Sequence, residues 1–266
     1  MGGGFVIKSQ SMEKLPVSLC VITLNEATNI QRCLQSVPFA SDIVVLDSGS
    51  SDETRTLAEG LGARVFDEEW RGFGSQKRRS VELAQYDWVL CLDADEALGA
   101  ELQKEIVQLL KNGFPARAGY KIPRKSWHLG RWLLHGGWYP DYQTRLFNRR
   151  QLQWSADDLH ESVRGENIEV LKNDLLHFPF DNLADQIATN NRYSTLGAEA
   201  LRKSGKQAGL WQLLSKPPVK FIELYIFKRG FLDGRAGFII AVGAAYSIFL
   251  KYAKFWEQNH SQPKKV

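Results

Sequence analysis

Three acidic residues follow directly after an apolar run near the middle of the chain. The run Val89-Leu90-Cys91-Leu92 leads into Asp93-Ala94-Asp95-Glu96. If the run is a strand, two carboxylates at positions i and i+2 just past its end can converge on one hard divalent cation, which prefers oxygen ligands and accepts phosphate oxygens as further ligands. We therefore expect Asp93 and Asp95 to hold Mg²⁺ or Mn²⁺. A solvated turn is the alternative interpretation, because Asp and Glu also favour helix N-termini.

Two earlier apolar runs also end in polar residues that suit a nucleotide. The first ends in Thr23-Leu24-Asn25-Glu26, and the second ends in Asp47-Ser48-Gly49-Ser50-Ser51-Asp52. A carboxylate at a strand end can accept a hydrogen bond from a base or a ribose, and small residues after it let backbone N–H groups approach a ligand. Capped helix starts are the alternative for both segments.

The elements that must position these residues alternate between short apolar runs and helical patterns. We expect strands over residues 17–23, 43–47, 63–66 and 88–92, and helices over 28–36, 52–62, 76–84, 99–111 and 181–203. Such alternation across short connections predicts an α/β fold with a mostly parallel sheet and helices on both faces. Sheets of this kind bind ligands beyond the carboxyl ends of their strands. Residues 120–170, rich in aromatic residues, Gly and Arg, are expected to form substrate-binding loops.

Size and composition describe a globular protein. The 266 residues are 44% hydrophobic, enough for one large core or two modest ones. The three cysteines, an odd number at wide spacing, predict neither a disulfide framework nor a zinc site and favour a reducing compartment. The N-terminal residues do not have the pattern of a secretory signal, so we expect the chain on the cytoplasmic side.

The C-terminal part of the chain is basic and aromatic. Residues 201–266 contain 12 Lys and Arg against three Asp and Glu, a net charge of +9, which leaves −5 for the first 200 residues. A bilayer-spanning helix needs about 20 apolar residues, and the nearly uncharged run 236–250 is shorter. A helix lying at an anionic membrane surface therefore fits better than a full span. The alternative is an amphipathic helix that packs on the rest of the chain.

Taken together, the three strand-end segments resemble family 2 of the inverting glycosyltransferases, which have the Rossmann-like GT-A fold. The resemblance covers about residues 16–165. A narrower branch, the bacterial lipopolysaccharide core β-1,4-glucosyltransferases, has later landmarks similar to Arg145-Leu146-Phe147, His160-Glu161 and residues 231–238. The resemblance implies transfer of glucose from UDP-glucose to a hydroxyl of a glycolipid acceptor, the inner core of lipopolysaccharide. It also implies a peripheral or monotopic protein at the cytoplasmic face of the inner membrane.

The same resemblance implies roles for individual residues. Those implied to bind the nucleotide sugar are Thr23, Asn25, Glu26, Asp47, Ser48, Lys77, Arg78 and Asp93. Asp95 is implied as the direct metal ligand, together with Asp93. For Lys77 and Arg78 the alternative is a solvated basic face.

Inverting transfer also needs a general base that takes the proton of the acceptor hydroxyl as the hydroxyl attacks the anomeric carbon. The resemblance favours Glu161 as this base, and Asp141, which lies among aromatic residues, is the rival. The residues expected on the acceptor side are Trp138, Arg145 and His160.

We expect a catalytic domain over residues 15–180, with a nucleotide-sugar half at 15–100 and an acceptor half at 101–180, and a helical membrane-associating region at 181–260. Three other functions compete. A nucleotidyltransferase would have a Gly-rich loop after its first strand, which Thr23-Leu24-Asn25-Glu26 lacks. A polyprenyl-phosphate glycosyltransferase has an acceptor that is already an anion and needs no base. A non-catalytic nucleotide-binding protein at the membrane is the third. Nucleic-acid binding is not expected, and the sequence does not predict an oligomeric state.

Overall fold

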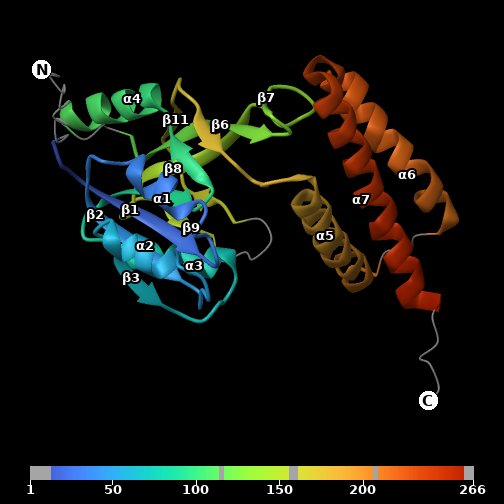
Figure 1. Cartoon of the computed structure of the whole chain (residues 1–266), viewed down its shortest axis with the longest axis horizontal. Helices are drawn as coiled ribbons and strands as arrows, with labels where there is room; N and C mark the ends of the chain where they lie inside the picture. The colour runs from blue at the N-terminus through green and yellow to red at the C-terminus, as the bar shows by residue number, and fades with distance from the viewer. Residues whose placement is uncertain (1–12, 114–116, 156–160, 206–208, 261–266) are drawn as a thin grey trace, which may run out of the picture. The chain divides into compact units, whose positions relative to one another are not determined.

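The computed structural model describes residues 13–113, 117–155, 161–205 and 209–260 (Figure 1). The chain forms two compact units. The first unit contains the described residues up to Pro123 together with Tyr142–Leu176. The second contains Arg124–Asp141 and the described residues from His177 onward. The domain boundary expected between residues 180 and 181 stays a prediction.

Four parallel strands form the centre of the first unit. They are β1 (Leu15–Thr23), β2 (Ala40–Asp47), β3 (Arg64–Asp67) and β4 (Trp88–Asp93). Strand β1 pairs with β2 on one side and with β4 on the other, and β2 also pairs with β3. Thr23 is in register with Asp47, and Ile22 with Asp93, so the polar ends of these strands meet at one edge of the sheet. The predicted α/β fold is confirmed.

Helices cover both faces of this sheet. They are α1 (Ile30–Gln35), α2 (Thr54–Gly60), α3 (Phe73–Glu82) and α4 (Ala100–Lys111). Successive residues of a strand point to opposite faces, which assigns each helix to one side. Leu19 and Val21 share a buried cluster with residues of α1, α2 and α4, whereas Cys20 shares another with Val81 of α3. The strand ends that carry the polar residues therefore lie between two packed layers.

The segment expected to consist of loops, residues 120–170, contains strands instead. The strands from Glu96 onward are β5 (Glu96–Leu98), β6 (Gly119–His128), β7 (Arg131–Leu133), β8 (Asp141–Asn148), β9 (Gln153–Trp154), β10 (Val163–Arg164), β11 (Ile168–Val170) and β12 (Leu175–His177). Within the described residues the large sheet has the order β3-β2-β1-β4-β8-β6-β12-β5. Strand β8 runs antiparallel to β4, and Leu146 is in register with Leu90. The prediction of loops was therefore wrong, and in β8 a buried charge, Arg145, interrupts the apolar alternation that identifies a strand.

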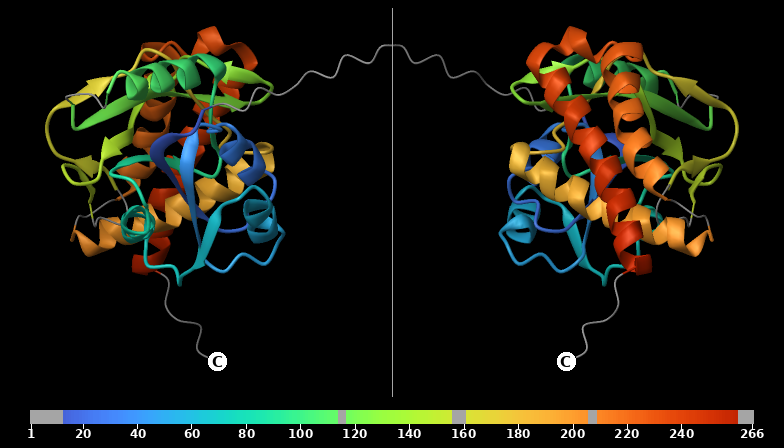
Figure 2. Two further views of the ribbon diagram at one scale, coloured as in Figure 1. Left: turned by 90° about the vertical axis from the view of Figure 1, so that its left-hand side faces the viewer. Right: turned by 90° about the vertical axis from the view of Figure 1, so that its right-hand side faces the viewer.

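The second unit is mainly helical. Its helices are α5 (Leu183–Lys203), α6 (Leu210–Ile222), the π-helix η1 (Glu223–Phe227), the 3₁₀-helix η2 (Gly230–Asp233) and α7 (Gly234–His260). Helix α7 packs between α5 and α6 (Figure 2). It is longer than the uncharged run 236–250, because its helical pattern continues through Lys251 and Lys254 to His260.

A buried aspartate joins the start of α7 to the turn after β7. Asp233 is 2% exposed and accepts hydrogen bonds from the backbone N–H groups of Leu134 and His135 at 3.1 and 2.8 Å. Close by, η2 and α7 approach so tightly that a Cβ on Gly237 would lie 1.8 Å from the carbonyl oxygen of Gly230. Only glycine fits at residue 237, so this contact fixes how α7 begins.

Candidate functional site

The acidic turn after β4 is held by charges from two other elements of the first unit. The backbone N–H of Asp93 donates to the Glu96 carboxylate at 3.0 Å. Lys77 Nζ lies 2.8 Å from Asp93 Oδ1, and Arg145 Nη2 lies 2.5 Å from Asp93 Oδ2. The same guanidinium nitrogen lies 2.6 Å from Glu96 Oε1. Helix α3 and strand β8 thus each contribute one cation to this turn.

Arg145 lies underneath the turn and is 2% exposed. Burial lowers the pKa of its guanidinium, but the carboxylates of Asp93 and Glu96 outweigh this effect and hold the pKa above its ordinary value. The side chain therefore stays charged and compensates two carboxylates, one of which, Glu96, is fully buried. In this position Arg145 braces the turn, and its expected contact with the acceptor stays a prediction.

Lys77 connects the acidic turn to Glu161. The residue is 6% exposed, and its ammonium lies 2.8 Å from Asp93 Oδ1 and 3.0 Å from Glu161 Oε1. It also lies over the indole ring of Trp154, 4.9 Å from the ring centroid, a cation–π arrangement. Three of the residues singled out in the sequence, from α3, β4 and the segment before β10, therefore meet at one place.

A second polar cluster links the ends of β1 and β2. The carboxylate of Asp47 is fully buried and accepts hydrogen bonds from the Thr23 hydroxyl at 2.9 Å, from the Ser50 hydroxyl at 2.5 Å and from the Ser50 N–H at 2.9 Å. The hydroxyl of Ser48 accepts a hydrogen bond from the Gln76 amide at 2.9 Å. Asp47 thereby fixes the loop that begins with Ser48.

Asn25 and Glu26 extend this cluster to the surface. Asn25 adopts a positive φ of 56°, its N–H donates to the Ser50 hydroxyl at 2.8 Å, and its side-chain oxygen accepts from the Ser51 N–H at 2.8 Å. The N–H of Glu26 donates to the Thr54 hydroxyl at 2.8 Å. Asn25 is exposed and Glu26 half-buried, so both can meet a ligand at this edge of the sheet.

The side chains at the turn could supply some, but not all, of the oxygen ligands of a divalent cation. Asp93 and Asp95 supply hard carboxylate oxygens, and both are half-buried at the end of β4. In the described ranges no three metal-ligating side chains gather into a site. Both carboxylate oxygens of Asp93 contact a cation, Lys77 or Arg145, and the assignment of Asp93 and Asp95 as metal ligands stays a prediction.

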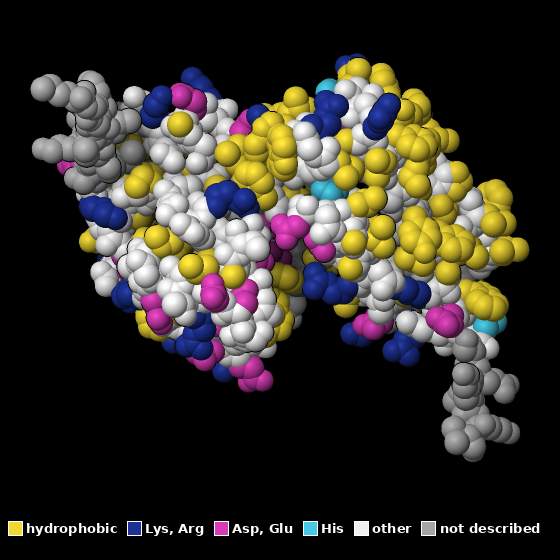
Figure 3. All heavy atoms as spheres, viewed as in Figure 1, with side chains coloured by type: hydrophobic (Ala, Val, Ile, Leu, Met, Phe, Trp, Pro, Cys, Tyr) yellow, Lys and Arg dark blue, Asp and Glu magenta, His cyan; other side chains and the backbone are white. Residues whose placement is uncertain are grey.

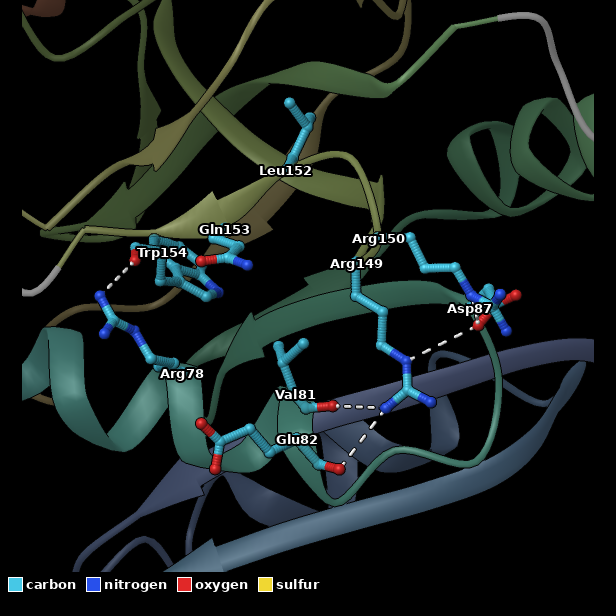
Figure 4. A pocket seen from close by; sticks show the side chains of 9 residues that line it. All are labelled: Arg78, Val81, Glu82, Asp87, Arg149, Arg150, Leu152, Gln153 and Trp154. Atoms are coloured by element: carbon cyan, nitrogen blue, oxygen red, sulfur yellow. Dashed lines mark hydrogen bonds and ion pairs between the residues drawn. The ribbon is translucent and has the colours of Figure 1, made fainter.

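Three further predicted residues, Arg78, Asp141 and Trp138, have contacts of their own. Arg78 donates to the backbone oxygen of Trp154 at 3.0 Å and lines a separate pocket of the first unit (Figure 4). Asp141 belongs to the second unit, where its Oδ2 accepts from Arg124 at 2.9 and 2.6 Å. Trp138, also in the second unit, stacks on His128 with ring centroids 6.3 Å apart. His160 lies outside the described residues.

Four residues at or beside the site received no role in the sequence interpretation. Glu96 anchors the turn, and Trp154 supports Lys77. Gln76 links the Ser48 hydroxyl to the carbonyls of residues 68 and 69, and the thiol of Cys33 donates to the backbone oxygen of Asp93 at 3.6 Å. Glu96 was visible in the sequence as the third acid of the motif, but no local signal distinguishes Gln76, Cys33 or Trp154.

Comparison with known proteins gives consistent results. The model of the family described as "Glycosyl transferase family 2" matches residues 18–172, more than half of the chain. A mannosyltransferase from Pyrobaculum calidifontis, solved in complex with GDP-Man and Mn²⁺, matches with a TM-score of 0.52 at 14% identity. That match covers 94% of this chain and 89% of the other, and it shows that the two proteins share a fold.

Two curated relatives match along nearly their whole length. The lipopolysaccharide core biosynthesis glycosyltransferase LpsC of Rhizobium meliloti is 30% identical over 92% of this chain and 94% of its own. An uncharacterized glycosyltransferase of Rickettsia bellii is 30% identical over 91% of this chain and 86% of its own. These matches, together with the acidic turn and the parallel sheet that presents it, show that the chain belongs to glycosyl transferase family 2.

Proposed function

We propose that the chain transfers glucose from UDP-glucose to a hydroxyl of a glycolipid, the inner core of lipopolysaccharide, with inversion at the anomeric carbon. The relation to LpsC, a lipopolysaccharide core biosynthesis glycosyltransferase, supports the acceptor class. The observation that carries the proposal is the position of Lys77, whose ammonium contacts both Asp93 and Glu161. This ammonium brings a carboxylate able to act as a base to the turn where the donor diphosphate would bind.

The transfer itself forms one bond and breaks one. The acceptor oxygen bonds to the anomeric carbon while the bond from that carbon to the diphosphate oxygen breaks, and Glu161 takes the hydroxyl proton. The half-buried Asp93 and Asp95 would hold a Mg²⁺ or Mn²⁺ ion, which when bound supplies positive charge for the leaving diphosphate. Lys77, which contacts Asp93 through one of its two ion pairs, can offer a further donor to the same phosphate oxygens.

The donor's nucleoside would lie against the loops after β1 and β2. Asn25 and Glu26 offer side chains at the surface, and Asp47 keeps Thr23 and Ser48 in place from below. Because Asp47 is fully buried and already accepts several hydrogen bonds, its role in donor binding is to fix the loop. Arg78, which contacts Trp154 instead, is left out of this donor site.

The exposed face of α6, η1 and α7 would hold the enzyme at the membrane that contains the glycolipid. The helical segment Gly230–His260 is long and apolar enough to cross a bilayer, judged by length and composition, and 22% of its most apolar window is buried. Hydrophobic side chains gather over α6 and α7 (Figure 3), with Trp211 76% and Phe227 79% exposed. We place this face on the anionic cytoplasmic surface of the inner membrane as a peripheral or monotopic anchor.

The charges of this face are consistent with anionic lipid. Basic residues in these elements or directly between them are Lys216, Lys220, Lys228, Arg229, Arg235 and Lys251. Lys254 has another function, because its ammonium donates to the Asn191 carbonyl at 2.8 Å and to the Ser194 hydroxyl at 2.8 Å, which ties α7 to α5. Glu223 is neutralised by Lys228 at 2.8 Å and Lys220 at 3.0 Å, which also lowers its pKa.

The direct test is a transfer assay with the full chain, UDP-glucose, Mn²⁺ and a glycolipid truncated to the inner core. We expect a new glycoside and one UDP released per transfer, both lost when the metal is chelated. Preferred transfer to a polyprenyl phosphate would replace this proposal with the polyprenyl-phosphate alternative. Absence of turnover with every nucleotide sugar and both acceptors would support a non-catalytic nucleotide-binding protein.

A further inference from the structure

The first unit contains a pocket that the transfer reaction does not use. It lies between helix α3 and the turn that joins β8 to β9, and its volume is about 370 Å³ (Figure 4). Its lining consists of three arginines, two acids, a glutamine and three apolar side chains. The side chains on which the argument depends are Arg78, Val81, Arg149, Arg150, Leu152 and Trp154.

The two acids of the lining are already compensated. Glu82 pairs with Arg79, which is not part of the lining, at 3.2 Å. Asp87 Oδ1 lies 2.8 Å from Arg150 Nε and 3.9 Å from Arg149 Nε, so one carboxylate faces two guanidinium groups. The lining therefore has a surplus of positive charge, which favours an anionic ligand.

Two of the guanidinium groups are fixed in place by backbone oxygens. Arg149 Nη1 donates to the Val81 oxygen at 3.0 Å, and Arg78 Nη2 donates to the Trp154 oxygen at 3.0 Å. Each guanidinium has five N–H donors, so Arg149 keeps donors for a ligand beyond the one that Val81 accepts, and fixing the side chain in advance reduces the entropy lost on binding.

We propose that this pocket binds a compact phosphate monoester, whose phosphate oxygens accept hydrogen bonds from Arg149 and Arg150, the two guanidinium groups that meet at Asp87. Guanidinium groups match the geometry of phosphate oxygens and bind them through paired hydrogen bonds. The apolar side chains of Val81 and Leu152 form a wall for the organic part of the ligand. This combination favours an ester over inorganic phosphate.

The pocket shares Trp154 with the proposed transfer site. One face of the Trp154 ring supports the ammonium of Lys77, which contacts Asp93 and Glu161, while the residue also lines the pocket. A ligand that shifts Trp154 would move Lys77 relative to both carboxylates. The bound ester would thereby change the transfer rate, and this second part of the inference rests on the proposed function.

Binding is tested by calorimetry on the full chain without metal or nucleotide sugar, using glycerol 3-phosphate and inorganic phosphate as probes. We expect the ester to bind more tightly than inorganic phosphate, and Arg150→Gln to weaken ester binding about tenfold. Arg117→Gln is the matched control, because Arg117 is an exposed arginine of the same unit that pairs with Glu169 at 3.1 Å. No ester binding, equal affinity for the two probes, or an equal loss in the control variant would overturn the proposal.

A competition experiment separates this pocket from the donor site. UDP-glucose with Mn²⁺ should not displace glycerol 3-phosphate, because Arg149 and Arg150 are not part of the proposed donor site. Complete displacement of the ester by the nucleotide sugar would place the ester in the donor site and refute the proposal. This arm needs binding only, so it gives an answer even if the chain transfers no sugar.

The coupling through Trp154 has its own test. Glycerol 3-phosphate should change the transfer rate of the wild type, and Trp154→Leu should remove that change while the ester still binds. Trp154→Phe, which keeps an aromatic face for Lys77, should retain it, and Trp154→Met replaces the leucine variant if that variant does not fold. An equal response of all three proteins would show that the ester acts elsewhere.

Discussion

The acidic turn of the first unit and the exposed face of α6 and α7 in the second unit differ in whether their side chains have partners. At the turn, Asp93 and Glu96 have cations within hydrogen-bond distance, and Arg145 between them is almost completely buried. On the helices, large apolar side chains such as Trp211 and Phe227 remain in solvent. The first region is preorganised before any ligand arrives, whereas the second has apolar surface that only a further partner would bury. Substitutions should therefore affect stability and chemistry in the first region and association in the second.

The largest effect is expected at Glu161. Glu161→Gln should keep donor binding but lower the rate of transfer by roughly 10² to 10⁴, the usual contribution of a general base. Steady-state kinetics with UDP-glucose measures the rate, and calorimetry measures donor affinity. Asp141→Asn is the matched variant in the second unit and should stay near the wild-type rate. The reverse pattern would assign the base to Asp141 and would show that the acidic turn has no catalytic base beside it.

The next effect concerns the buried cation beneath the turn. Arg145→Met removes the charge that compensates Asp93 and Glu96, and breaking a buried ion pair of this kind typically costs about 3 to 5 kcal/mol of unfolding free energy. Urea denaturation measures the loss. Arg117→Met, which breaks an exposed pair with Glu169, should cost less than about 1 kcal/mol. Similar losses for both variants would mean that the turn is no more preorganised than an ordinary surface.

Asp95 tests the metal assignment. Asp95→Ala should remove the Mn²⁺-dependent part of nucleotide affinity, since the variant loses a hard oxygen ligand close to the diphosphate. The folding free energy should change little. Calorimetry with and without Mn²⁺ provides the measurement, and an unchanged metal-dependent affinity would exclude Asp95 as a ligand. Glu101→Ala, at an acid in the first turn of α4, is the control.

The smallest effect per residue is expected on the helical face. Phe227→Ser should leave the unfolding midpoint almost unchanged, because the side chain is 79% exposed, yet weaken binding to anionic vesicles about tenfold if the ring enters the bilayer. Binding should also weaken with salt, by about 1 kcal/mol for each basic residue near the surface that becomes screened.

Vesicle flotation at low and high salt, with anionic and neutral lipid, measures both contributions. A chain ending at Leu210 serves as the control without α6 and α7. If the full chain floats no better than the shortened one with any lipid, this face packs on the first unit or on another subunit, and the contrast between the two regions disappears.

The central strands could be predicted from sequence because each contains a run of mainly apolar residues. β1, β2 and β4 are buried on both faces, and such runs are recognisable without knowledge of their neighbours. The polar residues at their ends then follow from the geometry of parallel strands. Local pattern was sufficient for this half of the fold.

Ion pairs between residues far apart in the sequence could not be predicted in the same way. The Lys77–Glu161 pair joins residues 84 positions apart, and nothing near either residue indicates the other. The burial of Arg145 was not predicted, because arginine is seldom fully buried, and its presence in β8 concealed the strand around it.

The three cysteines offer a way to observe one half of the molecule alone. Cys20, Cys33 and Cys91 are buried thiols, and all belong to the first unit. A hydrogen bond with Cys91, together with burial, raises the pKa of Cys20, and burial raises that of Cys33, so the reactive thiolate is scarce in the native state. Alkylation of these thiols should therefore require local opening of the central sheet of the first unit. The rate at which a thiol reagent modifies the protein should therefore report how often the core of the first unit opens. The helices of the second unit contain no cysteine, so they contribute no modification signal of their own.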